Sequence, residues 1–194
     1  MKGYTSVQKI ENYLLITIED YFKPQVEKWI EEIEDYIDKT TLRNFASGDV
    51  KYDRFFDGNC KDELFIDDFI ETESKALELK IDDVVITDTD ILRYPANKTP
   101  KVALKLKKGI FKKGNQNITA KALWGYSKTP PKDIEMAATT LVAGIINFSM
   151  TAEGEIASMT IGRYSVTYKN ERQWADYDRI AVILKSYYRK RYHY

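Results

Sequence analysis

The sequence predicts an α+β fold, in which a helical core carries an inserted antiparallel β-unit. Apolar residues recur at helical spacing near both ends of the chain, whereas between Tyr52 and Tyr126 they alternate with polar residues. No internal repeat and no low-complexity linker separates these parts, so we expect a single domain over residues 1–194.

The N-terminal part predicts two helices, over about residues 6–13 and 24–39. Ser6 suits the N-cap of the first helix, and Pro24 suits the first turn of the second, where a missing N–H breaks no helical hydrogen bond. In the longer helix the apolar residues share one face and acidic residues fill most other positions. These apolar residues are Val26, Trp29, Ile30, Ile33 and Ile37.

The middle of the chain, about residues 52–126, predicts four to six antiparallel strands. Three segments that start at Leu77, Val102 and Ile118 alternate apolar and polar residues, which is typical of strands with one buried face. Turn-forming residues separate the strands at positions 57–59, 95–100 and 113–115.

The C-terminal part predicts two more helices, over about residues 131–148 and 174–192. Thr129 suits the N-cap of the first, which carries an unbroken apolar stripe to Phe148. A short strand is expected between the helices, around residues 164–168. The last helix should bury one face, made of Tyr177, Ile180, Ala181, Leu184 and Tyr188.

Residues that carry chemistry are sparse. One cysteine, Cys60, and one histidine, His193, do not supply a zinc site, and His193 lies next to the C-terminal residue, where chains fray. No glycine-rich phosphate loop is present, and acidic pairs such as Asp82-Asp83 lack the spacing of a calcium loop. We therefore expect no enzymatic activity, no metal and no cofactor.

The sequence also bears on the compartment. No apolar run approaches the roughly 18 residues that a membrane span requires. A secreted fold of this size usually carries paired cysteines, and here Cys60 is single. We expect synthesis in the cytoplasm and no membrane partner.

Charge is distributed unevenly along the chain. Residues 1–90 hold 23 acidic and 11 basic residues, whereas residues 91–194 hold 7 acidic and 19 basic residues. Two interpretations remain open: the two halves face each other within one fold, or an acidic face of one subunit meets a basic face of the next. A head-to-tail contact of the second kind closes into a ring when the rotation per subunit permits.

The C-terminal segment KSYYRKRYHY combines arginine, lysine and tyrosine without an acidic residue. Arginine and tyrosine are enriched at desolvated partner surfaces and also where nucleic acid is bound. The alternative is a solvated helix end whose cations suit the helix dipole, which leaves the tyrosines unexplained. The candidate partner residues are Tyr187, Tyr188, Arg189, Lys190, Arg191, Tyr192 and Tyr194.

Three stretches, in this order, resemble the head–tail connector family of tailed phages and prophages, also called adaptor or head-completion proteins. The first, WIEEIEDYIDKTTLRNF, resembles the opening helix of the family with its Thr-x-Arg-x-Phe ending, here Thr41 to Phe45. The second, DRFFDGNCKDELFIDDF, resembles a strand–turn–strand with an aromatic-Asp-Gly turn. The third, ALWGYSKTPPKDIEMAATTLVAGII, resembles the entry into a packed helix, and IGRYSVTY resembles a later strand.

The resemblance implies a structural virion protein of the neck: a ring, usually of twelve subunits, beneath the portal protein. Such a ring bridges the capsid to a downstream neck or tail-completion protein, and packaged DNA crosses its lumen without sequence-specific binding. The β-insertion is longer than in compact members, and the sequence after residue 170 does not align with the family.

Two rival functions remain open. A nucleic-acid-binding protein would use the lysines of residues 101–113, which are expected to form a hairpin, together with the basic C-terminus. Another neck component, such as a stopper or tail terminator, would be dominated by β-structure, which the long predicted helices disfavour.

Overall fold

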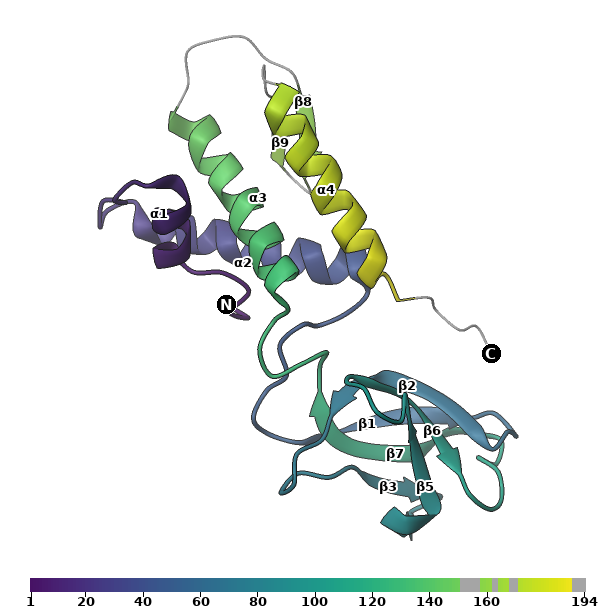
Figure 1. The fold of residues 1–194 in the computed structure, drawn as a ribbon. Coiled ribbons are helices and arrows are strands. Elements are labelled where there is room, and N and C mark those ends of the chain that lie inside the picture. Colours follow the sequence, from purple (N-terminus) through teal and green to yellow (C-terminus); the bar gives the residue numbers. More distant parts are fainter. Residues whose placement is uncertain (151–157, 162–163, 168–170, 190–194) are drawn as a thin grey trace. The chain divides into compact units, whose positions relative to one another are not determined.

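The chain forms two compact units in a computed structural model that describes residues 1–150, 158–161, 164–167 and 171–189 (Figure 1). A helical unit combines Met1–Arg43 with Pro130–Arg189, and a β-unit is built from Asn44–Thr129. The predicted α+β class, a helical core with an inserted antiparallel β-unit, is confirmed. The single domain stays a prediction.

The first two helices begin and end close to the predicted residues. Helix α1 spans Val7–Leu14, and the Ser6 side chain caps it by accepting a hydrogen bond from the Lys9 N–H at 3.3 Å. Helix α2 spans Lys23–Thr41, with Pro24 in its first turn. All five apolar residues predicted to share a face of α2 are buried. The helical period of the sequence therefore located this face correctly.

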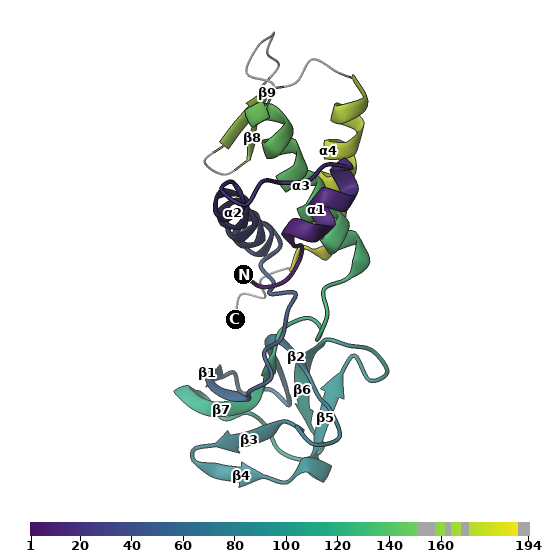
Figure 2. The same cartoon turned by 90° about the vertical axis from the view of Figure 1, so that its left-hand side faces the viewer.

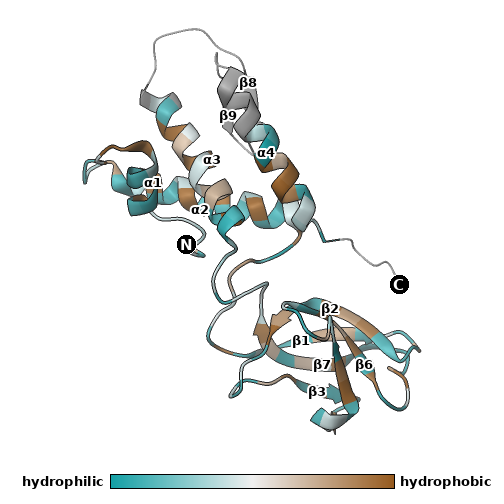
Figure 3. Ribbon diagram, viewed as in Figure 1, coloured by the Kyte–Doolittle hydropathy of each residue, from teal (hydrophilic) through white to brown (hydrophobic). Residues whose placement is uncertain are grey.

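Helix α3 spans Lys132–Met150 and packs against each of the other three helices. It is buried around most of its circumference between Ile134 and Ile146, and Figure 3 shows apolar residues along its length. Thr129 does not cap it. The helix begins later than this threonine allows, and the first helical hydrogen bond runs from the Glu135 N–H to the Pro131 carbonyl at 2.9 Å.

Polar contacts hold α1 and the N-terminal segment in place. The hydroxyls of Thr5 and Thr139 form a buried hydrogen bond of 2.7 Å, so neither is left unsatisfied. The Lys9 ammonium lies 2.9 Å from the Glu135 carboxylate, and its hydrogen bond holds the pKa of Glu135 below the ordinary value. The segment before α1 is thus fixed against α3 by a buried hydrogen bond, and α1 itself by a partly exposed ion pair.

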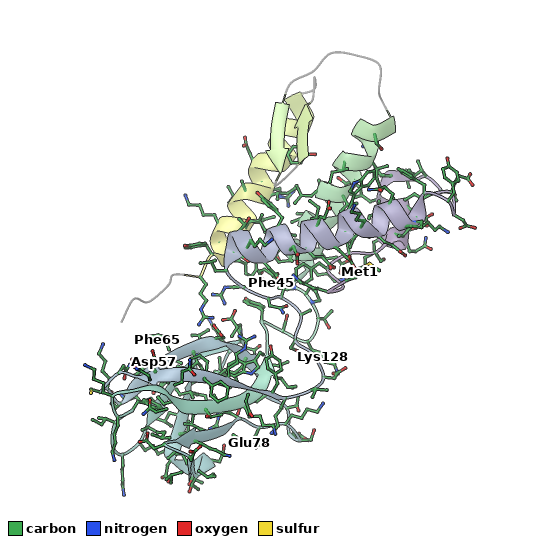
Figure 4. The ribbon with its side chains drawn as sticks, turned by 180° about the vertical axis from the view of Figure 1, so that it is seen from behind. Met1, Phe45, Asp57, Phe65, Glu78 and Lys128 are labelled. Atoms are coloured by element: carbon green, nitrogen blue, oxygen red, sulfur yellow. The ribbon has the colours of Figure 1, made fainter. Side chains whose placement is uncertain are left out.

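A fully buried carboxylate ties the start of the chain to α2. Glu34 is 0% exposed and accepts hydrogen bonds from the backbone N–H groups of Lys2, at 2.5 Å, and Tyr4, at 2.8 Å. Figure 4 shows Met1 beside α2. Burial of a charge is costly unless it is hydrogen-bonded, and these two N–H groups meet that requirement.

The last part of the helical unit differs from prediction. Strands β8 (Ser158–Ile161) and β9 (Tyr164–Thr167) form an antiparallel pair, of which only the second was predicted. Helix α4 spans Glu171–Tyr187, so the predicted end at residue 192 is wrong. The reason is that the Arg189 N–H donates to the Thr41 carbonyl at 2.9 Å, instead of continuing the helix.

The buried face of α4 is narrower than predicted. Tyr177, Ile180 and Leu184 are buried, as the helical spacing indicates. Ala181 and Tyr188 are exposed, which contradicts the prediction. Ala181 lies at the edge of the buried stripe, and Tyr188 lies beyond the end of the helix.

The β-unit contains a seven-stranded sheet that curls into a half-barrel (Figure 2). All its pairings are antiparallel, with the order β4-β3-β7-β2-β6-β5 and β1 paired to β7. The prediction of four to six strands missed the shortest ones, which are too short to show a period. The strands are β1 Tyr52–Gly58, β2 Glu63–Ile70, β3 Glu78–Ile81, β4 Val84–Ile86, β5 Ile91–Tyr94, β6 Lys101–Leu106 and β7 Gly114–Trp124.

The lysine-rich segment is not a hairpin, because the strands on its two sides are not neighbours. Strand β2 lies between β6 and β7 in the sheet, and Leu64 of β2 pairs with Leu104 of β6. Residues 107–113 therefore cross from one strand position to another. A tertiary pairing of this kind leaves no mark on local turn residues.

Trp124 is the centre of the apolar core of the β-unit. Its ring contacts those of Phe56 and Phe69, with centroids 5.8 Å and 6.0 Å away. The indole N–H donates to the Tyr52 carbonyl at 2.7 Å, and the Arg54 guanidinium lies over the ring at 4.8 Å. Its apolar surface is thus buried while its single donor is satisfied.

The two ends of the inserted unit are joined in what we call the stem, residues 44–47 and 125–127. The Tyr126 N–H donates to the Asn44 carbonyl at 2.7 Å, and the Ser47 N–H donates to the Ser127 carbonyl at 2.9 Å. Gly125 has φ +141°, and a Cβ there would lie 2.8 Å from the backbone of Ser47. The stem therefore requires glycine at this position, for both conformation and space.

Substitution of Gly125 by alanine should destabilise the protein by about 2–4 kcal/mol, because the strained φ adds to the clash with Ser47. Chemical denaturation followed by circular dichroism measures this difference. Gly109→Ala is the matched control, since Gly109 has φ +85° but nothing within 4 Å of an added Cβ. Equal losses of stability for the two variants would contradict the close approach in the stem.

Candidate assembly interface

The structure describes three of the seven residues predicted to contact a partner. Tyr187, Tyr188 and Arg189 lie at the end of α4 and just beyond it. Lys190, Arg191, Tyr192 and Tyr194 lie outside the described residues. The three described residues have different environments.

Tyr187 points into the helical unit. Its hydroxyl lies 3.0 Å from each carboxylate oxygen of Asp133, in the first turn of α3, and donates to that carboxylate. Its carbonyl accepts a hydrogen bond of 2.6 Å from Nε of Arg43. Tyr187 is half-buried and joins α4 to the first turn of α3 and to the end of α2. Its spacing from Tyr177, Ile180 and Leu184 is helical, so the period could have assigned it to the buried face.

The next two residues differ in environment: Arg189 is held through its backbone, whereas the ring of Tyr188 is exposed. The Arg189 N–H is held by the Thr41 carbonyl, and its side chain is half-buried. Tyr188 is 50% exposed and is the most accessible of the three predicted residues. Arg189 thus fixes the end of α4, and Tyr188 next to it faces solvent.

The residues Thr41–Phe45 explain how this end is fixed. The Thr41 hydroxyl donates to the Ile37 carbonyl at 2.8 Å, Leu42 ends α2 in the left-handed conformation, and Arg43 binds the Tyr187 carbonyl. Phe45 is fully buried in the β-unit, where its ring lies 5.4 Å from that of Tyr126. Thr41 and Arg43 were not among the predicted site residues, although the Thr-x-Arg-x-Phe stretch pointed to them.

The lysines of residues 101–113 divide into two groups. The Lys101 ammonium donates to the carbonyls of Pro95, at 2.6 Å, and Ala96, at 2.7 Å, while Lys105 pairs with Asp62 at 3.1 Å. The lysines of the crossing segment, at positions 107, 108, 112 and 113, are exposed and form no ion pair with another described residue. This segment is fixed by buried Phe111, whose backbone exchanges hydrogen bonds with Cys60 and Lys61.

Sites of other kinds do not appear among residues 1–150, 158–161, 164–167 and 171–189. Over these ranges, no three histidine, cysteine, aspartate or glutamate side chains gather as metal ligands. Within the same part of the chain, no helix has the length and apolar character of a membrane span. Cys60 is exposed and lies in a turn.

The charge asymmetry of the sequence largely disappears when the chain folds. Met1–Arg43 and Pro130–Arg189 together contain 16 acidic and 13 basic residues. The segment Asn44–Thr129 contains 14 acidic and 15 basic residues. Both units draw residues from the acidic and the basic half of the sequence, so neither unit carries the net charge of one half.

Comparison with known sequences gives no relative: no family model matches the chain, and no curated protein matches it.

Comparison with solved structures gives a shared fold. One match is a chain in the neck of an empty GTA particle computed with C6 symmetry, with a TM-score of 0.54 and 9% identity. Another is a chain in the virion of a native gene transfer agent (GTA) particle, with a TM-score of 0.52 and 11% identity. Each match covers 91% of this chain and 82% of the other chain. At this identity the likeness concerns the fold, and it extends over nearly the whole chain.

Proposed function

We propose that this protein is a structural neck subunit, a head–tail connector adaptor that forms a ring beneath the portal protein and bridges capsid to tail. The observation that carries the proposal is the fold shared with a chain of a GTA particle neck, over 91% of this chain. The order of the three family-like stretches supports it independently: the first builds the end of α2, the second builds β1, β2 and the turn between them, and the third builds the stem and α3.

A ring is the expected assembly. The neck of the matched GTA particle was computed with C6 symmetry, which suits six copies of a subunit and also twelve, since a twelvefold ring contains the sixfold rotation. The proposed ring has twelve subunits, a number that sixfold symmetry permits. The partners proposed are the portal protein and a downstream neck or tail-completion protein, with packaged DNA crossing the lumen.

The rival functions have less support. A nucleic-acid-binding role would use a lysine-rich hairpin and the basic C-terminus. Residues 107–113 form a crossing segment instead of a hairpin, and Lys101 and Lys105 bind groups of their own chain. A stopper or tail terminator would be dominated by strands, whereas the described residues of this chain form four α-helices. A structural role without catalysis fits the neck of a particle.

The direct test is to mix the purified protein with portal complexes and to look for a stoichiometric ring by electron microscopy. We expect one ring docked on the portal. A ring that binds only the tail-proximal side of a preformed neck would instead indicate a stopper, and absence of any ring would contradict the proposal.

A truncation that ends at Arg189 should lose docking on the portal while keeping its fold. It retains the Tyr187–Asp133, Tyr187–Arg43 and Arg189–Thr41 contacts, which a shorter chain ending at Lys185 would remove. Co-sedimentation with portal complexes measures docking, and thermal unfolding serves as the control. Docking of this truncated chain at the wild-type level would show that residues 190–194 are not the contact.

The two neighbouring tyrosines should behave differently. Tyr187→Phe should lower the stability by about 1–2 kcal/mol, because it removes the hydrogen bond to a carboxylate. Tyr188→Ala should leave stability nearly unchanged and weaken docking, since this ring is largely exposed. Thermal unfolding and co-sedimentation separate the effects, and the reverse pattern would contradict the assignment.

A further inference from the structure

Two exposed surfaces lie at opposite ends of the helical unit. One is the connection between α1 and α2, which we call the acidic tip. The other is the outward side of α4, which we call the basic face. Figure 1 shows α1 and α4 on opposite sides of α3. Helix α2 has 19 residues, about 28 Å at 1.5 Å per residue, and connects the two ends.

The acidic tip combines exposed apolar side chains with acidic groups. Leu15 is 89% exposed and Tyr21 is 85% exposed, and Tyr13 is also exposed. Glu19 and Asp20 lie between them in the chain and are exposed, and Asp20 pairs with Lys23 at 2.6 Å. Figure 3 shows apolar residues in this connection. Neighbouring exposed apolar side chains of this size are typical of an interaction surface.

The tip is a fixed loop, not a loose one. Ile18 is buried, and its N–H donates to the Glu11 carboxylate at 2.8 Å. The ring of Phe22 contacts that of Trp29 in α2, with centroids 5.6 Å apart, and the ring of Tyr21 lies tilted against that of Phe22, with centroids 6.5 Å apart. A partner that binds Leu15 and Tyr21 therefore has little loop ordering to impose.

The basic face of α4 has the complementary composition. Val182 is 67% exposed, and the cations Arg179 and Lys185 are exposed one turn before and one turn after it. Asp178 is exposed beside them and is the one acidic residue of this face among residues 177–189. Apolar Val182 between two cations matches apolar Leu15 and Tyr21 beside Glu19 and Asp20.

We propose that the acidic tip of one copy of this chain binds the basic face of α4 of the next copy. This inference rests on the proposed ring and names the contact that builds it. Surfaces at opposite ends of one unit cannot meet within a single copy, and repeating a head-to-tail contact of this kind generates a ring when the rotation closes. The charge complementarity favours a second copy as the partner and sets the order in which copies would join.

Disulfide trapping tests the contact between copies. Leu15→Cys and Val182→Cys are made separately in a Cys60→Ser background, because Cys60 is exposed. The two full-length variants are mixed and oxidised, both at high concentration and on portal complexes. We expect cross-linked dimers in the mixture and only background in each variant alone. The double variant should give a ladder that ends at the size of the ring.

The outcomes separate this inference from the proposed function. A ring on the portal without the Leu15–Val182 cross-link overturns the inference and leaves the connector function intact. Absence of both ring and cross-link overturns both. Cross-linking of Leu15→Cys with itself would indicate a two-fold contact and would also overturn the head-to-tail arrangement.

Charge reversal gives an independent measurement. Glu19→Lys with Asp20→Lys, or Arg179→Glu with Lys185→Glu, should weaken ring assembly about tenfold, and mixing the two variants should restore association between unlike copies. Asp53→Lys with Glu73→Lys, two exposed acids of the β-unit, is the matched control and should assemble normally. Failure of the mixture to associate better than each variant alone would refute the pairing of these surfaces.

Leu15 also permits a test in which the stability of the fold and the strength of assembly should change in opposite directions. It ends α1 with φ +57°, a conformation that favours glycine, so Leu15→Gly should raise the unfolding temperature while weakening assembly. Leu42, with φ +56° at the end of α2, is half-buried and lies outside the tip. Leu42→Gly should leave assembly unchanged, and an equal loss of assembly in both variants would contradict a specific role of the tip.

Discussion

The fold depends on the stem, because a long β-unit interrupts the helical unit, whose segments before and after the insertion must still pack together. The chain leaves the helical unit after Arg43 and returns at Pro130, so the two crossings have to lie together. Backbone hydrogen bonds between residues 44–47 and 125–127 provide this, and Gly125 allows the two segments to approach. With the stem formed, α3 can follow the β-unit and still pack against α1 and α2.

The stretches that resemble connector proteins are structural residues of this arrangement. Arg43 binds the end of α4, Phe45 and Tyr126 contact each other in the β-unit, and Gly58 leaves room for the Lys112 carbonyl, from which an added Cβ would be only 1.6 Å. These positions constrain the backbone where units and strands join.

A subunit of the proposed ring needs several surfaces that bind different neighbours. The end of α4 illustrates how closely these roles lie, since Tyr187 is bonded to Asp133 and Tyr188 is exposed beside it. The acidic tip and the basic face occupy the far ends of the same helical unit. In the proposed ring, such a division would allow lateral contacts and portal contacts to use separate side chains.

The sequence by itself determined the fold class, the positions of the first three helices, the buried face of α2 and the alternation of the longer strands. These follow from periodic burial, which is written locally along the chain. The sequence also indicated Arg43 and Tyr126 through family-like stretches, without their contacts. It did not identify β4, β5 and β8.

Only the tertiary structure decided how segments far apart in the chain pair and pack. The insertion of β2 between β6 and β7 removed the expected hairpin, and the Thr41 carbonyl ended α4 near Arg189 instead of residue 192. The folding of both sequence halves into each unit cancelled most of the charge asymmetry. In each case the physical reason is a pairing between residues far apart in the chain, which local pattern cannot encode.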